Sequence, residues 1–274
     1  MPEGDTVHRW AVRMHAVLTG RALKRIEIRR NTRGQRPPAP GTCVTGVEAR
    51  GKHLLVHFDD GATLHTHMQV QGIWQVYAPG ARWRRPAHQA RVVLEVDDGS
   101  SAVCFDAPVV ELRRNPSATV PTRAQRSLER LGPDLCAEPP DLDRVLARAH
   151  AVPAETPLGD VLLDQRVGSG IGNVFKSEIC WARRVHPSTP VGELSDRELR
   201  DIYETARAQL HANLGGGRRV TYHGGLAVYG KVRRPCPRCR TPIRRAWAGA
   251  DARVTYWCPR CQPEGTAVTP TVTE

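Results

Sequence analysis

The hydrophobic pattern of the chain begins with one helical stripe. Between residues 5 and 19 the apolar positions recur at the spacing of one face of an amphipathic helix. The stripe consists of Val7, Trp10, Ala11, Met14 and Leu18. Asp5 or Thr6 can cap its start, and Gly20 can end it. We therefore expect the chain to open with a helix over residues 5–19.

The helical period is lost between residues 22 and 112. Two turn signals, Asp59-Asp60-Gly61 and Asp97-Asp98-Gly99, interrupt short runs of β-branched and aromatic residues. The clearest runs cover residues 54–58, 63–64, 73–76 and 91–96. Many short strands joined by tight turns predict an antiparallel sandwich or barrel.

The pattern turns helical again beyond a polar, proline-punctuated linker over residues 115–121. Thr156-Pro157 opens one helix, and a glycine-rich turn over residues 168–172 leads into a second from about Val174. Ser195 and Glu198 form a capping box that opens a third helix, which ends at residues 215–217. We expect residues 218–232 to be a mobile loop, and the Pro/Thr/Glu-rich tail after Cys261 to be disordered.

Charge and apolar run length narrow the class of protein. The chain has 40 Lys and Arg against 28 Asp and Glu, a net charge of +12, which is typical of a nucleic-acid binder. The alternative is a basic protein whose charge serves solubility alone. No apolar run is long enough for a membrane span, and the N-terminus does not resemble a signal peptide. We therefore expect a cytoplasmic protein, associated with the nucleoid if the source is a prokaryote.

Four cysteines have the spacing of a metal site. Cys236 and Cys239 form one Cys-x-x-Cys pair, and Cys258 and Cys261 form a second pair after eighteen residues. Two such knuckles supply four thiolates to one structural Zn²⁺ ion per chain. Two disulfides in a secreted protein are the alternative. We expect buried thiols in a reducing compartment at Cys43, Cys104, Cys136 and Cys180.

The N-terminus has candidate catalytic groups. Removal of the initiator Met would expose the secondary amine of Pro2, which can attack a sugar carbon and form a cationic iminium. The positive end of the helix after it favours the neutral amine, and Glu3 can transfer protons. Without other evidence, Met-Pro-Glu is an ordinary start of a chain.

Three further motifs are open to two interpretations each. The turn over residues 168–173 can hold a phosphate on backbone amides, or it is a plain connection between helices. Lys52 heads a strand and is a solvated charge or an anion contact. His65 and His67 share a strand face, where ordinary packing is favoured over metal binding because no third ligand is evident.

Together, these motifs resemble the formamidopyrimidine-DNA glycosylase/endonuclease VIII family, closer to the endonuclease VIII branch. The resemblance covers residues 2 to about 262. It is carried by Pro-Glu-Gly after Met1, Gly-Lys-His-Leu-Leu at 51–55, Leu-Gly-Pro-Asp-Leu at 131–135, the run 162–173 and CPRC…CPRC-Gln262.

The resemblance implies a multidomain α+β fold with bound DNA between its parts. It implies an N-terminal antiparallel β-sandwich catalytic domain with an N-terminal helix over residues 1–116. A helix–two-turn–helix DNA-binding domain over 122–228, a zinc finger over 229–262 and a disordered tail over 263–274 would follow. We expect a monomer whose partner is damaged DNA, with no membrane.

Particular roles follow from the resemblance as well. Pro2 is the expected nucleophile, Glu3 the acid/base, and Lys52 a catalytic-site lysine that contacts DNA phosphate. Asn173 and Arg253 are the expected phosphate ligands. Gln69, with Val70 and Gln71, occupies the place of the side chains that fill the gap left by a flipped base. The expected zinc ligands are Cys236, Cys239, Cys258 and Cys261.

Two departures from the family pattern affect the expected substrate. Thr6 replaces a second glutamate that many members have. Arg113-Arg114 resembles an Arg-Arg-Phe-Gly loop of the purine-specific branch, but Asn115-Pro116 replaces its Phe-Gly. We expect a bifunctional DNA glycosylase/AP lyase that removes oxidised pyrimidines through a Schiff base on Pro2 and cleaves by β,δ-elimination. The alternatives are a non-catalytic DNA-damage binding protein on the same scaffold and a zinc-ribbon transcription or RNA-processing factor.

Overall fold

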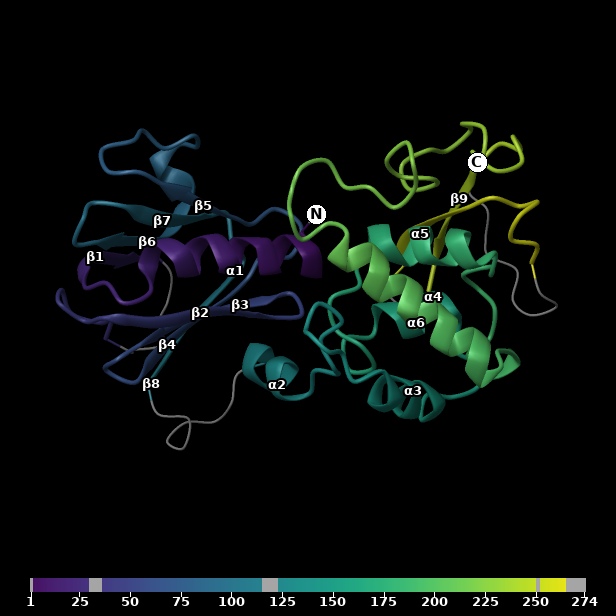
Figure 1. Ribbon diagram of the computed structural model, residues 1–274, viewed down its shortest axis with the longest axis horizontal. Helices are drawn as coiled ribbons and strands as arrows, with labels where there is room; N and C mark the ends of the chain where they lie inside the picture. The colour runs from purple at the N-terminus through teal and green to yellow at the C-terminus, as the bar shows by residue number, and fades with distance from the viewer. Residues whose placement is uncertain (1, 30–35, 115–122, 250–251, 265–274) are drawn as a thin grey trace. The chain divides into compact units, whose positions relative to one another are not determined.

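The computed structural model describes residues 2–29, 36–114, 123–249 and 252–264. The chain divides into two compact units, Met1–Glu129 and Arg130–Glu274 (Figure 1). The expected linker over 115–121 and the tail from residue 265 lie outside the described residues. The finer division of the second unit at residue 228 stays a prediction.

The first unit contains two antiparallel sheets of four strands each. The first sheet has the order β1 (Leu23–Ile28), β6 (Ala90–Val96), β7 (Ser101–Phe105) and β5 (Ile73–Tyr77). The second has the order β2 (Val44–Arg50), β3 (His53–Phe58), β4 (Ala62–His67) and β8 (Val109–Arg114). A 3-10 turn, η1 (Ala87–Gln89), precedes β6. The architecture is therefore a sandwich and not a closed barrel, and the four predicted β-runs lie in β3, β4, β5 and β6.

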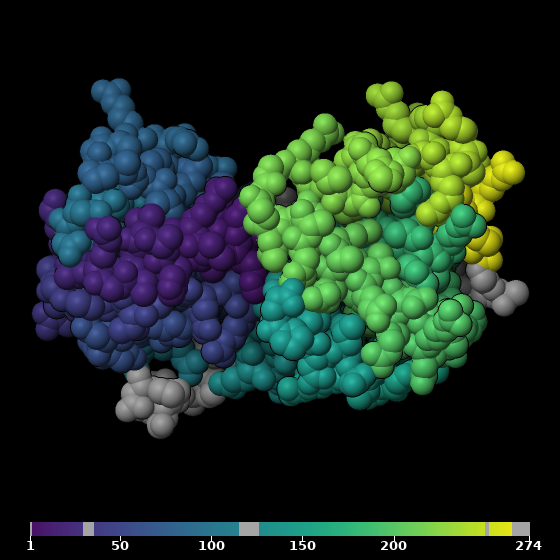
Figure 2. All heavy atoms as spheres, in the orientation of Figure 1, coloured from purple at the N-terminus to yellow at the C-terminus, as the bar shows by residue number. Residues whose placement is uncertain are grey.

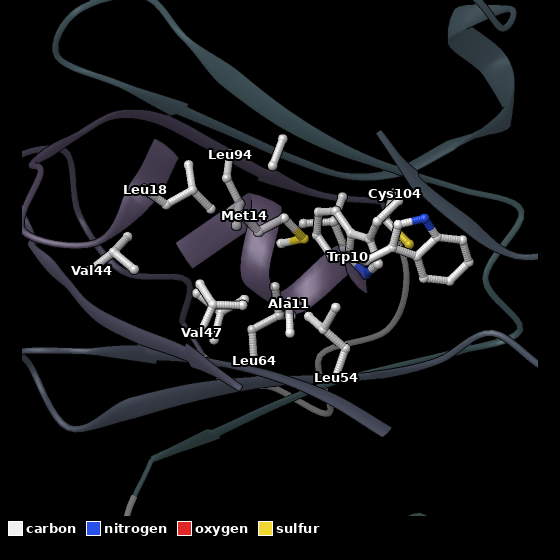
Figure 3. Packing of buried hydrophobic residues seen from close by; sticks show 14 of the residues in the cluster. Trp10, Ala11, Met14, Leu18, Val44, Val47, Leu54, Leu64, Leu94 and Cys104 are labelled. Carbon is white, nitrogen blue, oxygen red and sulfur yellow. The ribbon is translucent and has the colours of Figure 1, made fainter. Parts of the chain in front are cut away.

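Helix α1 (Gly4–Leu18) packs its apolar stripe into the core of this sandwich. In Figure 3, Met14 lies between Leu94 of one sheet and Leu64 of the other. The opposite face of the helix is at the surface, where Val12 is 70% exposed and the purple atoms are visible in Figure 2. The amphipathic pattern therefore predicted both the helix and its buried face.

The predicted start of this helix is wrong by one residue, because its N-cap is Glu3 and not Asp5 or Thr6. The backbone of Glu3 is extended, and its carbonyl accepts from the amides of Thr6 at 3.0 Å and Val7 at 3.1 Å. The Thr6 hydroxyl instead donates to the Asp5 carboxylate at 3.1 Å. The cap therefore depends on backbone geometry, which the cap preferences of Asp and Thr did not indicate.

The direction of α1 determines which end of the sandwich holds the N-terminus. Trp10, early in the helix, and Leu54, at the start of β3, lie towards one end of the core in Figure 3, whereas Leu18 and Val44, at the start of β2, lie towards the other. Since β2 and β3 are antiparallel, the turn between them lies at the same end of the unit as the start of α1.

The second unit is built on helices and one hairpin. Its elements are α3 (Leu142–His150), α4 (Leu158–Leu163), α5 (Asn173–Arg183), η2 (Val191–Glu193), α6 (Asp196–His211), β9 (Arg244–Ala248) and β10 (Arg253–Trp257). The apolar core lies between α3, α4, α5 and α6, and includes Phe175 and Tyr203. The predicted capping box of α6 is confirmed, since Ser195 and Glu198 exchange hydrogen bonds. Helix α3 and the short α2 (Arg123–Glu129) of the first unit were not predicted.

Two surface properties complete the description. None of the helices within the described ranges is long and apolar enough to cross a bilayer. On β9, Trp247 is 61% exposed, whereas Trp257 on the paired strand is 2% exposed. The hairpin therefore has one tryptophan in the protein interior and one in solvent.

Candidate active site and DNA interface

The candidate nucleophile and its neighbour lie at the start of α1. Pro2 directly precedes the N-cap, and the side chain of Glu3 is fully buried at 0% exposure. The amide dipoles of the 15-residue helix put partial positive charge at this end. A cationic proline nitrogen is disfavoured there relative to the neutral, nucleophilic amine. The local geometry therefore suits both expected roles.

Lys52 lies in the tight turn between β2 and β3. Gly51 has a φ of +57°, which glycine adopts at little cost, and Arg50 pairs with His53 across the turn. The turn brings the half-buried Lys52 to the same end of the unit as Pro2 and Glu3. Two segments about fifty residues apart in the sequence thus supply one end of the sandwich.

A group of imidazoles, of which His53 and His65 are buried and His67 is half-buried, adjoins Lys52. His53 Nδ1 lies 2.8 Å from His65 Nε2, and the rings of His53 and His67 are 4.7 Å apart. Burial lowers the pKa of His53 to about 2 and that of His67 to about 4, and the neighbouring imidazoles and Lys52 contribute. The packing interpretation of His65 and His67 agrees with this geometry. His53 was missed, although the register of β3 against β4 brings it opposite His67.

The turn after β4 presents the candidate gap-filling residues at the same end. His67 is the last residue of β4 and pairs with His53 at the start of β3. Gln69 has a φ of +46°, and Val70 at the tip is 61% exposed. The tight turn is closed by Gly72, whose amide donates to the Met68 carbonyl at 2.9 Å. Val70 therefore provides the exposed apolar side chain of this turn.

Arg113 and Arg114, which resemble the start of an Arg-Arg-Phe-Gly loop in the sequence, lie in a strand and not in a loop. Both residues belong to β8, where Arg113 pairs with Thr63 and Arg114 with Ala62. That pairing puts them at the opposite end of the sheet from His67, and Arg114 forms an ion pair with Asp60 at 2.6 Å. The sequence pattern did not indicate how far β8 extends, so their place in the sheet was missed.

The four predicted metal ligands converge in the second unit. The Sγ atoms of Cys236, Cys239, Cys258 and Cys261 all lie within 4.8 Å of one another. The Cys236–Cys261 and Cys239–Cys258 separations are 3.9 Å and 3.4 Å, near the S–S edge of about 3.8 Å that a Zn–S bond of about 2.3 Å implies. A disulfide needs about 2.0 Å. Trp181 Nε1 donates to Cys236 Sγ at 3.4 Å, which further stabilises a thiolate. The site is a closed structural zinc site.

The other cysteines are less uniform than expected. Cys104, Cys136 and Cys180 are buried, whereas Cys43 is partly exposed. Burial raises the pKa of Cys180 to about 12, so this thiol stays protonated.

The two predicted phosphate ligands of the second unit are brought together by α5 and β10. Asn173 begins α5, and its Nδ2 donates to the carbonyl of Val254 at 2.7 Å. Val254 follows Arg253, the first residue of β10. Oδ1 of Asn173 is buried and accepts no hydrogen bond from the described residues. Asn173 and Val254, 81 positions apart in the sequence, therefore meet beside the exposed Arg253.

A buried carboxylate that the sequence analysis missed orders the segment before the zinc finger. Glu178 on α5 is 0% exposed and accepts from the amides of Ala227 at 2.7 Å, Val228 at 2.9 Å and Tyr229 at 2.7 Å. The Thr221 hydroxyl also donates to it. These bonds hold the backbone of residues 227–229, while the expected mobility of the whole segment 218–232 stays a prediction. Four donors on one acidic side chain left no local signal in the sequence.

A β-sandwich, a helical core and a hairpin with four cysteine ligands together define a zinc-finger DNA glycosylase. Family models match the formamidopyrimidine-DNA glycosylase N-terminal domain over residues 1–108 and its H2TH domain over residues 131–222. A third model, the zinc finger found in FPG and IleRS, matches residues 234–263. The chain belongs to the formamidopyrimidine-DNA glycosylase/endonuclease VIII family.

Individual relatives cover nearly the whole chain. A protein of Streptomyces coelicolor named probable endonuclease 8 2 is 44% identical over 96% of this chain and 94% of its own length. The DNA-(apurinic or apyrimidinic site) lyase Nei2 of Mycolicibacterium smegmatis is 36% identical over 96% of this chain and 99% of its own. The fold also matches the crystal structure of the Lactococcus lactis glycosylase bound to DNA with a benzylated formamidopyrimidine lesion. There the TM-score is 0.78 and the identity 19%, over 96% of this chain and all of that one.

Proposed function

We propose that the protein is a bifunctional DNA glycosylase/AP lyase of base excision repair that uses Pro2 as its nucleophile. The observation that carries the proposal is the assembly at one end of the sandwich. Pro2 and the buried Glu3 precede α1 there, beside the turn that holds Lys52. The family and the lyase name of a close relative support the same reaction class.

The reaction follows from the chemistry of a secondary amine. The lone pair of the Pro2 nitrogen attacks C1′ of the damaged nucleotide, and the base leaves with a proton supplied at the site. The sugar ring opens to an iminium, which withdraws electrons and acidifies C2′. Loss of a C2′ proton expels the 3′ phosphate, and a second elimination expels the 5′ phosphate. Glu3 is the group that delivers and removes protons.

The second unit binds DNA and contributes no catalytic group. Asn173 and Arg253 hold backbone phosphates, and Lys52 holds one from the first unit; such contacts carry affinity without sequence information. The zinc ion keeps the hairpin of β9 and β10 folded. The target nucleotide must leave the stack for Pro2 to reach C1′, and the Gln69–Gln71 turn, with exposed Val70, fills the gap it leaves. We propose that the chain acts as a monomer, in the cytoplasm and at the nucleoid of a prokaryotic source.

Oxidised pyrimidines are the proposed substrates. The Pro-Glu-Gly start resembles the pyrimidine-acting branch, and the names of the relatives quoted above favour that branch. Ring-saturated pyrimidines are non-planar and stack poorly, which lowers the cost of extrusion. The arginines of β8 no longer bear on this choice, because they lie at the other end of the sheet.

Borohydride trapping tests the nucleophile. Reduction of the iminium should cross-link the protein to DNA that contains an abasic site. An N-terminal extension should abolish the cross-link, and Pro2→Gly should weaken it because a primary amine replaces the ring nitrogen. Lys52→Ala removes the other candidate amine and keeps Pro2, so it should still be trapped when the protein is concentrated enough to saturate the DNA. Full trapping by the extended protein would assign the nucleophile to another amine, whereas no trapping by the unmodified protein would favour the non-catalytic alternative.

A cleavage panel tests the substrate separately. Thymine glycol and dihydrouracil should be released faster than 8-oxoguanine opposite cytosine by the same preparation. The product should be a one-nucleotide gap with phosphate on both ends. Equal or faster release of 8-oxoguanine would overturn the pyrimidine assignment while the reaction class stands.

A further inference from the structure

A buried lysine lies where α5 meets the zinc hairpin. Lys176 is 2% exposed, although lysine is among the residues least often buried. It follows Asn173 by three residues and so shares a face of α5 with it. Its Nζ donates a hydrogen bond of 2.7 Å to Oγ1 of Thr255, which is 3% exposed on β10. The ammonium group is thus directed at the strand that begins with Arg253.

The hydrogen bonds from Lys176 continue to Arg253 in one direction. An ammonium group can only donate, so the Thr255 hydroxyl must accept from Lys176. The single proton of that hydroxyl then goes to the carbonyl of Arg253, at 3.2 Å. The Arg253 carbonyl is thus the last acceptor in this series of hydrogen bonds, which holds the backbone of Arg253 in place. The direction of each bond is fixed by the identity of the donors and does not depend on the solvent.

A second bond from the same helix face holds the next residue. The Asn173 side chain donates to the carbonyl of Val254 at 2.7 Å, so α5 grips Val254 and Thr255 in succession. The two strands of the hairpin pair by register, with Arg253 opposite Ala248. The start of β10 is therefore fixed from α5 on one side and from β9 on the other.

Apolar packing alone does not account for a lysine at this position. Burying an ammonium group is costly unless it is paired, and an unbranched apolar side chain of similar length fills the space at lower cost. Asp160 of α4 lines the same cavity of about 220 Å³ as Lys176 and Thr255, and offers a compensating charge. The ammonium group of Lys176 therefore orients the strand through its hydrogen bond to Thr255, which a methionine side chain could not form.

We propose that Lys176 is a positioning residue for DNA binding, which acts through Thr255 on the backbone of Arg253. It holds the Arg253 guanidinium at the angle that meets a phosphate, without touching DNA itself. This inference rests on the proposed role of Arg253. It adds a determinant inside the protein to a set of contacts on its surface.

Two nearly isosteric variants test the series of hydrogen bonds from Lys176 through Thr255 to Arg253. Lys176→Met removes the donor and its charge, and Thr255→Val removes the acceptor without changing charge. Thr255→Ser keeps the hydroxyl and should bind as the wild type does. Thr205→Val on α6 is the matched control, because its hydroxyl donates to the Asp201 carbonyl away from the hairpin. Affinity is measured for duplex DNA with a tetrahydrofuran abasic-site analogue, at several salt concentrations.

Both variants should bind about tenfold more weakly, the effect of one hydrogen bond to a charged group. The salt dependence should fall towards that of Arg253→Ala, by up to about one unit of slope. In an Arg253→Ala background neither variant should weaken binding further, since the interaction is already lost. Zinc content and thermal unfolding report whether the fold is intact.

Additive losses in the Arg253→Ala background would overturn the inference, and so would wild-type affinity of Thr255→Val. If Lys176→Met does not fold, the comparison of Thr255→Val with Thr255→Ser decides alone. Unchanged affinity of Arg253→Ala would instead refute the proposed clamp, so the two failures are distinguishable.

Discussion

The two units of this protein are each stabilised by a different kind of interaction. The sandwich of the first unit surrounds one apolar core that α1 completes, with Met14, Leu64 and Leu94 at its centre (Figure 3). The second unit has an apolar helical core as well, but its hairpin depends on polar bonds and thiolates. Glu178 and Lys176 are each at most 2% exposed there.

This difference indicates how each unit relates to its task. An apolar core is non-directional and tolerates many substitutions, which suits a scaffold that only has to present Pro2 and Glu3 at one end. Directional bonds fix the angle of a strand, which suits the proposed role of the second unit in aligning Arg253 with a phosphate. The second unit should therefore be more sensitive to changes that remove one donor or one ligand.

Zinc removal should produce the largest difference in stability between the two units. Structural zinc contributes about 10–16 kcal/mol in zinc-finger peptides, so chelation or Cys258→Ser should unfold the hairpin of β9 and β10. DNA affinity should collapse with it, because Arg253 begins β10. Hydrogen exchange resolved to each unit should show the sandwich unchanged. Loss of protection in β3 and β6 to the same degree would contradict independent units.

Glu3→Gln should break the chemistry of the first unit without affecting the grip of the second. Proton transfer by a positioned carboxylate is worth about 10²–10⁴-fold, so release of an intact damaged base should fall by that range. Cleavage of a preformed abasic site should survive better, because the base has already left. Single-turnover rates on the two substrates measure the division, and equal losses would disprove it.

Leu64→Ala should test the apolar core alone. Leu64 on β4 is 0% exposed in the core that α1 completes, and truncation of a buried leucine costs about 2–5 kcal/mol. Hydrogen exchange should report the loss in the first unit, with zinc retention unaltered.

The polar counterpart, Glu178→Ala, should leave three amides unpaired and loosen residues 227–229 of the second unit. The comparison would be contradicted if Leu64→Ala reduced protection mainly in the second unit, or if Glu178→Ala reduced it mainly in the first.

Acid should weaken the first unit through its buried imidazoles. His53 and His67 have lowered pKa values in the folded state, so the unfolded chain binds their protons first. Their contribution is present above a pH of about 6.5 and is lost as pH falls towards about 4 for His67 and about 2 for His53. His53→Leu should reduce the slope of unfolding free energy against pH by up to about 1.4 kcal/mol per unit. The groups that face His53 are His65, His67 and Lys52. An unchanged slope between pH 6 and pH 4 would show that His53 is not the group.

The smallest expected effect compares one cation from each unit. Lys52→Ala and Arg253→Ala should each weaken binding to all DNA sequences alike and lower the salt slope by about one unit. A sequence-dependent loss at either position would assign it to base recognition.

The sequence predicted the features that depend on local pattern. The stripe of α1, the capping box at Ser195 and the spacing of the four cysteines are each readable within about twenty-five residues. The role of Pro2 came from resemblance, since Met-Pro-Glu has no pattern of its own. Asn173 and Arg253 were assigned in the same way, and the structure adds the bond from Asn173 to Val254 that brings them together.

The missed features depend on contacts between distant segments. Glu178 meets its amide donors 49–51 residues later, and Lys176 meets Thr255 after 79 residues. His53 joined the imidazole group only through the register of β3 and β4. Arg113 and Arg114 were misplaced because pairing with β4, not composition, determines where β8 ends. Register and long-range polar pairing are tertiary properties, so no window of the sequence contained them.

The exposed tryptophan of the hairpin gives the protein an intrinsic optical probe. The chain has six tryptophans; Trp247 is 61% exposed, while Trp10, Trp74, Trp181 and Trp257 are each at most 9% exposed. The sixth, Trp83, is half-buried. A soluble quencher such as iodide therefore reaches Trp247 most readily, and Trp247→Phe separates its signal from that of Trp83. Since Trp247 lies opposite Val254, its emission senses the surroundings of the residue next to Arg253. Seating of the hairpin on DNA can thus be timed by stopped flow on the unlabelled protein.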